Sequence, residues 1–364
     1  MKCCLFYLRT QLQLVTALNM IDANMQAEGD LVCILADRLI NEETKKELEV
    51  LHIFSRVLLL PTSEPSLKKW VCNKELRKVY PLGQFFNPSQ RGETFLEKHK
   101  HLFQEAISYI KSATDIYFHA DEDSVLTLTQ RNCKRHLLDE GTRSYTPSSL
   151  TCHPDALYLY DVNLCRKSNA MAVQLPKLSP ARTVLLSWLN KIYPISQDLA
   201  SDIFFDQPLG KRPFYPLTNL SAKSRLECNK FVSRIQILND AKMRAPGELL
   251  IRMHPGTSKA QKNYLKVRFN TMQSRTPFEL EILNSRTPRY NLSTIYSSGA
   301  CHWMLMLSQE FIASIDYKIN IYLPKYTSLS GDKIDRSVFS YFFELSKRHN
   351  NIEMIYPSNQ ILTL

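Results

Sequence analysis

GELLIRMHPG, residues 247–256, joins a short apolar run to the pair His254-Pro255. Residues 249–251 are typical of a short buried strand, because the run is brief and turn residues close it. Pro255 cannot donate a hydrogen bond to a strand ladder, and it favours an extended conformation at His254. We therefore expect His254 at the carboxyl end of a strand, where open α/β sheets bind ligands. On these residues alone, a polar residue that merely ends a strand is the more common explanation.

Other apolar runs of strand length alternate with helical patterns along the chain. Such alternation predicts an α/β fold, with mostly parallel sheets and crossover helices. The predicted strands cover residues 3–8, 31–36, 55–60, 115–119, 156–160, 214–217, 249–251, 278–283, 294–296, 319–323 and 352–356. Helices are expected after an N-cap at Thr10 and over residues 41–51, 94–112, 180–192, 221–238, 300–312 and 336–347.

The proline-rich segment FFDQPLGKRPFYPLTN, residues 204–219, interrupts this alternation and predicts a hinge between domains. We expect a first Rossmann-like domain over residues 1–205 and a second over residues 206–364. The chain length of 364 residues is sufficient for two buried cores.

Glycine is scarce, with only nine residues in the chain. Neither GxGxxG nor GxxxxGK[ST] occurs, which argues against a Rossmann dehydrogenase and against a P-loop enzyme. The hydrophobic content of 44% and the charged content of 22% are those of an ordinary globular protein.

The net charge of +11 favours an anionic partner, although the cations are spread along the chain and mostly indicate a solvated surface. Nine cysteines without a CxxC pair indicate a reducing compartment. No stretch approaches the roughly 18 apolar residues of a membrane span. We expect a cytoplasmic protein whose basic surface allows peripheral contact with an anionic inner membrane.

An acidic cluster follows the predicted strand in DIYFHADEDS, residues 115–124. The carboxylates of Asp121, Glu122 and Asp123 repel one another, so at least one pKa there should be raised, as a general base requires. A solvated acidic turn is the more common explanation of such a triplet.

Paired serines occur in IYSSGA, residues 295–300, between a predicted strand and a predicted helix. The hydroxyls of Ser297 and Ser298, together with backbone N–H groups at a helix start, can bind an anion. An ordinary N-cap is the alternative. His254 can donate to the same kind of group, since imidazole can stabilise a phosphate that is leaving.

The three patterns together resemble the motifs of the bacterial sialyltransferases, and in particular of the lipooligosaccharide sialyltransferase family. These enzymes carry an Asp/Glu-Asp/Glu-Gly motif, an HP motif and an S-S/T motif, in this order, on a GT-B scaffold. The segment CLFYLRTQLQLVTALNMI, residues 4–21, is also similar to this family. So is the segment YSSGACHWML, residues 296–305. TPFELEIL, residues 276–283, is similar to its Pro-aromatic-x-apolar-Glu segment.

The resemblance implies two Rossmann-like domains that face each other across a central cleft, the first binding the acceptor and the second the nucleotide sugar. It implies an inverting, metal-independent transfer of sialic acid from CMP-sialic acid to a glycan hydroxyl, without a cofactor and without nucleic acid as a partner. An acid of the first domain would deprotonate the acceptor, and His254 would assist the departing phosphate. Glu281 would lie near the ribose, and the implied donor-binding residues are His254, Pro255, Gly256, Glu281, Ser297, Ser298 and Gly299.

One departure from the family pattern leaves the catalytic base open. The family's acidic motif ends in Gly, whereas Asp121-Glu122-Asp123 and Glu122-Asp123-Ser124 end in Asp or Ser. The alternatives to a sialyltransferase are a GT-B enzyme with another nucleotide sugar and a basic, non-catalytic protein that binds nucleic acid or acidic polymers. Acceptor sugar, linkage, processivity and oligomeric state do not follow from the sequence.

Overall fold

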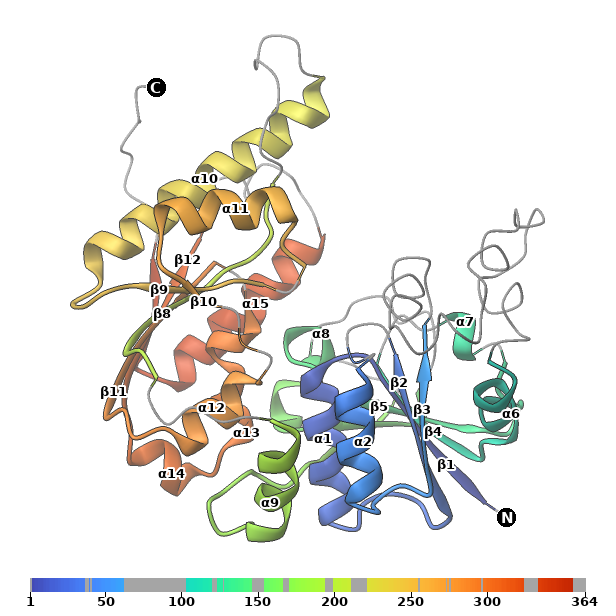
Figure 1. Cartoon of the computed structure of the whole chain (residues 1–364). Coiled ribbons are helices and arrows are strands. Elements are labelled where there is room, and N and C mark those ends of the chain that lie inside the picture. The colour runs from blue at the N-terminus through green and yellow to red at the C-terminus, as the bar shows by residue number, and fades with distance from the viewer. Residues whose placement is uncertain are drawn as a thin grey trace. The chain divides into compact units, whose positions relative to one another are not determined.

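Two parallel β-sheets with helices packed on them make up the protein, as Figure 1 shows. The computed structural model describes residues 2–36, 39, 41–61, 103–119, 123–126, 128–145, 154–165, 170–193, 199–210, 221–254, 256–272, 274, 276–295, 297–323 and 333–355. The predicted strand at 214–217 and the first part of the predicted helix at 94–112 lie outside these residues.

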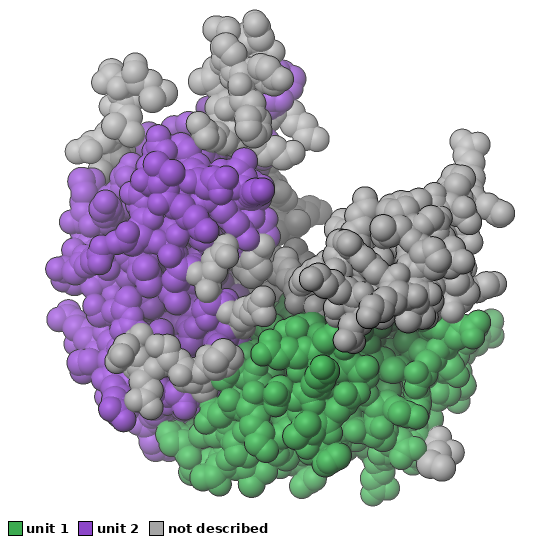
Figure 2. Space-filling view, in the orientation of Figure 1, with its two compact units in different colours: residues 1–140, 149–194 green, residues 141–148, 195–364 purple. Residues whose placement is uncertain are grey.

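The chain divides into two compact units, coloured separately in Figure 2. Unit 1 comprises Met1–Glu140 and Ser149–Pro194, and unit 2 comprises Gly141–Ser148 and Ile195–Leu364. The predicted boundary after residue 205 is therefore wrong. Strand β8, Asp202–Phe205, pairs with two strands of the second sheet, so the division must precede it, and the predicted hinge starts inside unit 2.

Unit 1 contains a seven-stranded parallel sheet in the order β3-β2-β1-β4-β5-β6-β7. Its elements are β1 Cys3–Leu8, α1 Gln11–Asp22, β2 Asp30–Ala36, α2 Glu42–Val50, β3 Arg56–Leu60, α6 Gln104–Ser112, β4 Asp115–Phe118, α7 Asp123–Leu126, β5 Lys134–Leu138, β6 Ala156–Leu159, η4 Val162–Leu164, β7 Met171–Gln174 and α9 Thr183–Ile192.

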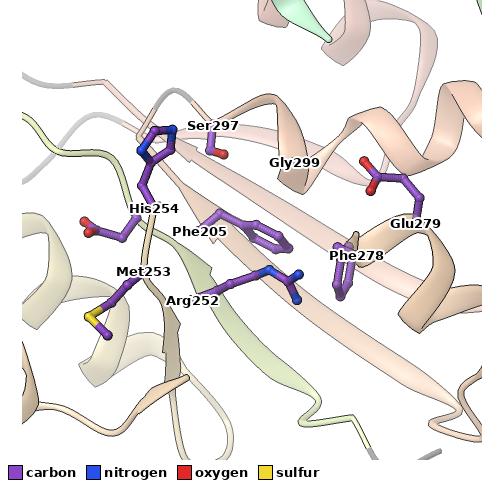
Figure 3. Close-up of a pocket in the computed structure, with 9 residues that line it drawn as sticks. Phe205, Arg252, Met253, His254, Phe278, Glu279, Ser297 and Gly299 are labelled. Carbon is purple, nitrogen blue, oxygen red and sulfur yellow. The ribbon is translucent and has the colours of Figure 1, made fainter. Parts of the chain in front are cut away.

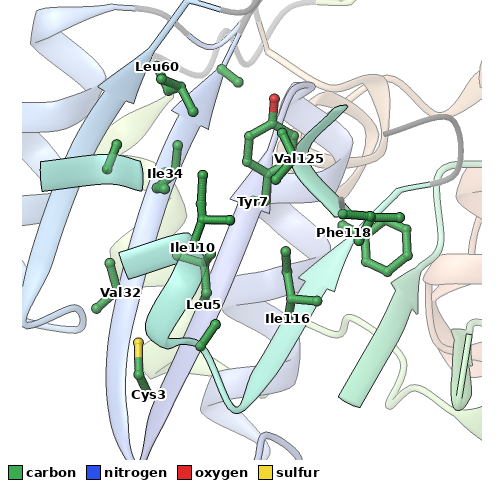
Figure 4. Close-up of a cluster of buried hydrophobic side chains, with 14 of the residues drawn as sticks. Cys3, Leu5, Tyr7, Val32, Ile34, Leu60, Ile110, Ile116, Phe118 and Val125 are labelled. Carbon is green, nitrogen blue, oxygen red and sulfur yellow. The ribbon is translucent and has the colours of Figure 1, made fainter. Parts of the chain in front are cut away.

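The apolar start of the chain explains the centre of this sheet. Every residue of β1 is buried, as expected for a strand covered on both faces. Alternate residues of β1 enter a core cluster with β2, β4 and α6, which Figure 4 shows. Thr10 caps α1 as predicted, because its hydroxyl accepts from the Gln13 N–H while the Gln13 side chain accepts from the Thr10 N–H.

Unit 2 contains a six-stranded parallel sheet in the order β10-β9-β8-β11-β12-β13. In chain order this is 3-2-1-4-5-6, the strand order of a doubly wound Rossmann-like sheet. The α/β fold class with two Rossmann-like halves is confirmed. The elements are α8 Thr142–Tyr145, β8, α10 Ala222–Arg244, β9 Leu250–Arg252, α11 Lys259–Arg268, β10 Thr271–Met272, α12 Phe278–Asn284, β11 Arg289–Thr294, η6 Ser298–Ala300, α13 His302–Met306, α14 Gln309–Ala313, β12 Asp316–Tyr322, α15 Lys333–Arg348 and β13 Ile352–Ile355.

Three predictions about local structure in unit 2 are wrong. Residues 278–283 form helix α12 instead of a strand, and all six are buried, so no helical periodicity marks them in the sequence. The strand predicted at 294–296 is the longer β11, which ends where that prediction begins. The single helix predicted at 300–312 is broken into η6, α13 and α14, with Ser308 capping the last.

None of the helices described here has the length and apolar character needed to cross a membrane. Within the same part of the chain, seven cysteines are present as free thiols: Cys3, Cys4, Cys33, Cys133, Cys165, Cys228 and Cys301.

Candidate functional site

A pocket of about 140 Å³ lies at the carboxyl ends of neighbouring strands in unit 2 (Figure 3). Phe205 of β8 is in register with Arg252 of β9 on one side and with Thr294 of β11 on the other. Strand order reverses at β8, and ligands of doubly wound sheets bind at such a switch point. The lining residues are Phe205, Asp206, Arg252, Met253, His254, Phe278, Glu279, Ser297 and Gly299.

His254 lies two residues after the end of β9, at the carboxyl end of a strand as predicted. The backbone N–H of Gly256 donates to its Nδ1 at 3.0 Å. A neutral imidazole that accepts at Nδ1 carries its proton on Nε2. The half-buried ring can therefore donate from Nε2 to a ligand in the pocket. Pro255 lies outside the described residues.

The serine turn is attached to the central strand by one buried hydroxyl. Thr294 donates from its hydroxyl to the carbonyl of Phe205 at 3.1 Å, and its Oγ1 accepts from the Ser297 N–H at 2.8 Å. A Cβ on Gly299 would lie 3.3 Å from the Phe205 ring, so glycine allows the turn to pass close to β8. These contacts hold Ser297 at the end of the pocket where Figure 3 shows the His254 ring.

Ser298, the second predicted serine, does not line the pocket and instead lies against Gly141. Gly141 has a φ of +94°, and a Cβ there would be 2.5 Å from Ser298 Oγ. This position requires glycine both for its backbone conformation and for the close approach. The segment that follows is anchored in unit 2, because Tyr145 is buried with its ring centroid 5.7 Å from that of Tyr341.

Glu281, predicted near a nucleotide ribose, is committed to other protein groups. Its carboxylate forms an ion pair with Arg252 and accepts from the Ser274 hydroxyl. Arg252 also donates to the carbonyl of Thr276, and its guanidinium lies 5.7 Å from the centroid of the Phe278 ring. Glu281 thus positions an arginine of the pocket and does not line the pocket itself.

Glu279, two residues earlier on α12, is the carboxylate that lines the pocket. Only 4% of this residue is exposed. Burial raises the pKa of the Glu279 carboxyl, and electrostatic interactions with His302 and Arg252 only partly oppose this. A ligand with hydroxyl groups could provide this carboxylate with the hydrogen bonds that water supplies elsewhere.

A second carboxylate, Asp206, lies at the end of β8 and is paired with Arg234 of α10. The side chains of both residues are inaccessible to solvent. Burial raises the pKa of Asp206 despite the neighbouring guanidinium and a backbone hydrogen bond. The pair connects Asp206, a lining residue of the pocket, to the long helix α10.

The structure does not describe the side chains of the three acids predicted as the catalytic base. Asp121 and Glu122 lie outside the described part of the chain. Asp123 is the first residue of α7, and its side chain is also outside it.

An acidic triplet that the sequence reasoning missed stands directly after β5. Asp139-Glu140-Gly141 has the acidic-acidic-glycine pattern without departure, and Gly141 is the glycine that contacts Ser298. Asp139 is buried and accepts the Tyr160 N–H at 3.0 Å. The glycine and its position after a strand were the available signals, but the strand itself was not predicted.

Glu140 of this triplet is held in its ionised form. Its Oε2 is 2.5 Å from Nε2 of His119. Burial opposes ionisation of Glu140, but the charge of His119 and hydrogen bonds from His119, Thr10 and Gln13 outweigh it and keep the pKa of the carboxyl below its usual range.

No group of three or more His, Cys, Asp or Glu side chains is arranged to hold a metal ion among the residues with described positions. The expected metal independence remains a prediction. The sequence patterns did not predict six of the pocket residues: Phe205, Asp206, Arg252, Met253, Phe278 and Glu279. Phe205 and Asp206 lie in the segment interpreted as a hinge, and Phe278 and Glu279 lie in a segment interpreted as a strand.

Comparison with known proteins does not assign the chain to a family. No family model matches, and no curated protein matches by sequence. Among solved structures, the chain is similar to residues 113–497 of a sialyltransferase from Photobacterium damselae, described as its GT-B domain, with 10% identity, a TM-score of 0.47, and coverage of 98% of this chain and 100% of that one. The chain is also similar to a spinosyn rhamnosyltransferase complexed with thymidine diphosphate, with 9% identity, a TM-score of 0.43, and coverage of 99% of this chain and 87% of that one. A third similar structure is Arabidopsis thaliana UGT89C1 complexed with quercetin, with 9% identity, a TM-score of 0.41, and coverage of 98% of this chain and 85% of that one. Similarity at this level does not identify an activity.

Proposed function

We propose that the protein is an inverting GT-B glycosyltransferase that moves sialic acid from CMP-sialic acid to a hydroxyl of a cell-surface glycan. Unit 2 binds the donor and unit 1 the acceptor. The observation that carries the proposal is the shared pocket of His254 and Ser297 at the switch point of the second sheet. The two residues come from the HP and serine motifs on which the resemblance rests.

The chemistry of the pocket suits a phosphate that departs with its nucleotide. Nε2 of His254 and the Ser297 hydroxyl both can donate to a phosphate oxygen, and such donors stabilise charge that develops as the glycosidic bond breaks. The pocket is smaller than the roughly 300–1,000 Å³ of whole-ligand sites, so it fits one group of a donor. A CMP leaving group contains a single phosphate, and metal bridging of a diphosphate is not required.

Glu279 is the residue to which we assign the contact with donor hydroxyls. It lines the same pocket as His254, whereas Glu281 is held by Arg252. This assignment moves the predicted ribose contact by two residues along α12.

The catalytic base in this proposal is Asp139 or Glu140. Both carboxylates belong to the triplet that matches the family motif. The lowered pKa of Glu140 keeps it ionised but makes it a weaker base, so motif position and not pKa is the support for this assignment. Asp121, Glu122 and Asp123 are the competing candidates. Asp139→Asn and Glu140→Gln can be compared with Asp121→Asn, Glu122→Gln and Asp123→Asn in one transfer assay. Loss of activity confined to the last three variants would return the base to the earlier triplet.

The decisive experiment measures release of CMP from CMP-sialic acid, with and without glycan acceptors. His254→Ala should lower the rate by about 10²-fold or more, because it removes the donor to the departing phosphate. His52→Asn is a control, since this histidine belongs to unit 1 and asparagine tolerates its φ of 52°. It should leave the rate unchanged.

Two other outcomes would replace this proposal. Release of nucleotide from a UDP or GDP sugar, but not from CMP-sialic acid, would indicate the same type of enzyme with another donor. Binding of an oligonucleotide with a steep salt dependence, without binding or turnover of any nucleotide sugar, would indicate a basic binding protein.

A further inference from the structure

Two basic helices, α10 and α11, lie side by side on one face of the second sheet (Figure 1). Each ends in the same kind of triplet, with an aliphatic residue between two cations: Lys242-Met243-Arg244 in α10 and Lys266-Val267-Arg268 in α11. All six residues are exposed. We call these six residues the terminal patch.

The fold brings the two triplets together although they are more than twenty residues apart in sequence. Ala241, Leu265 and Phe269, which flank the triplets, are buried in one hydrophobic cluster. Nζ of Lys242 lies 5.9 Å from the centroid of the Phe269 ring, next to the end of α11. The patch is therefore one surface built from two helix ends.

The aliphatic members of the patch are unusually exposed. Val267 is 82% exposed and Met243 is 72% exposed, the two highest values for large hydrophobic side chains in the described part of the chain. The helix macrodipole favours cations at carboxyl ends and accounts for the lysines and arginines. It does not account for an aliphatic side chain in solvent between them.

The patch carries an excess of positive charge. Its triplets contain no acid, and the neighbouring Asp240 forms an ion pair with Arg244 at 3.0 Å. Arg268 packs its guanidinium 3.9 Å from the Tyr264 ring centroid, which supports the end of α11. A partner surface with negative charge above an apolar layer complements this arrangement.

We propose that the terminal patch docks the protein on the surface of an anionic phospholipid bilayer. Lysine and arginine side chains lie near lipid phosphates, while Met243 and Val267 enter the boundary between headgroups and acyl chains. This inference is independent of the proposed catalytic activity, because neither donor nor acceptor takes part. The four cations of the patch contribute to the net charge of +11, and binding to anionic lipid would give this part of the charge a function.

Sedimentation of the full-length protein with lipid vesicles tests the proposal. Vesicles of phosphatidylglycerol and phosphatidylcholine should bind it, and pure phosphatidylcholine vesicles should not. Lys242→Gln with Lys266→Gln should weaken binding by about tenfold or more, since each cation contributes roughly a fivefold factor near an anionic surface. Met243→Ser with Val267→Ser should weaken it by about fivefold or more, because less apolar area enters the bilayer.

Met171→Ser with Val184→Ser provides a matched control, since these residues are 65% and 55% exposed but belong to unit 1. It should bind vesicles as the wild type does. Equal binding to neutral vesicles would overturn the proposal. So would full binding by the serine variant of the patch together with loss in the glutamine variant, because that pattern describes a site for any polyanion. An oligonucleotide titration of the same variants, with circular dichroism to verify folding, identifies that outcome.

Discussion

The buried ion pair between Asp206 and Arg234 allows a sharp test of how the pocket is built. Arg234→Met replaces the guanidinium side chain by an apolar side chain that is nearly as long, and it leaves the Asp206 carboxylate without its cation. Both side chains are inaccessible to solvent, so water cannot replace the lost partner. Breaking such a pair costs about 3–5 kcal/mol in the free energy of unfolding. We expect unit 2 of the variant to unfold at a clearly lower urea concentration at pH 8.

The loss of unfolding free energy in Arg234→Met should depend on pH in a predictable direction. Burial already raises the pKa of Asp206, and removal of the arginine, which lowers it, must raise it further. The folded state then binds a proton more tightly than the unfolded state, so stability falls as pH rises from the unfolded pKa to the folded one. The deficit of Arg234→Met relative to the wild type should therefore be smaller near pH 5 than at pH 8.

Urea unfolding followed by circular dichroism at the two pH values measures this effect. Asp206→Leu combined with Arg234→Met should recover part of the loss, since two apolar side chains leave no buried charge. The exposed pair Lys318–Glu353 is the control, and Glu353→Gln should cost less than about 1 kcal/mol. A deficit that is the same at both pH values, or that the double variant does not reduce, would refute the reasoning.

Two further predictions concern residues near the pocket. Gly141→Ala should lower the free energy of unfolding by about 1–3 kcal/mol in urea titrations, because alanine disfavours a φ of +94°. Ser298→Ala in the same chain should recover only the part due to the 2.5 Å approach, and full recovery would contradict the backbone argument. Glu279→Gln should raise stability at pH 8 but not near pH 5, since burial raises the pKa of Glu279 and only its ionised form is destabilising. The same variant should bind CMP more weakly in calorimetry, and unchanged affinity would remove Glu279 from the donor site.

Local sequence patterns were sufficient for much of unit 1 and for the position of His254. The six apolar residues of β1 and the capping box at Thr10 specify their structures through neighbouring residues. The run before His254-Pro255 forms a strand for the same reason, and His254 follows its carboxyl end. In these cases the contacts that stabilise an element lie within it or directly beside it.

Patterns failed where burial was complete or where an element is short. Helix α12 is buried on all sides, so its apolar run was indistinguishable from a strand. Strand β8 has four residues and precedes a proline, and it was divided between a domain and a hinge. The Asp139–Gly141 triplet follows a strand that carries no apolar run in the sequence, because β5 begins with Lys134 and Arg135.

The residue types and motifs were therefore determined by the sequence: a histidine after a strand, paired serines before a helix, and cations at helix ends. Only the tertiary structure decided which of them meet. Parallel pairing of β8 with β9 and β11 brings residues 205, 252 and 294 into register, and so places His254, Ser297 and Glu279 around one pocket. Glu281 does not line that pocket, because its carboxylate forms an ion pair with Arg252. Strand order and burial depend on contacts between segments that are distant in the sequence. The local periodicity of a single sequence does not reveal which distant segments will be in contact.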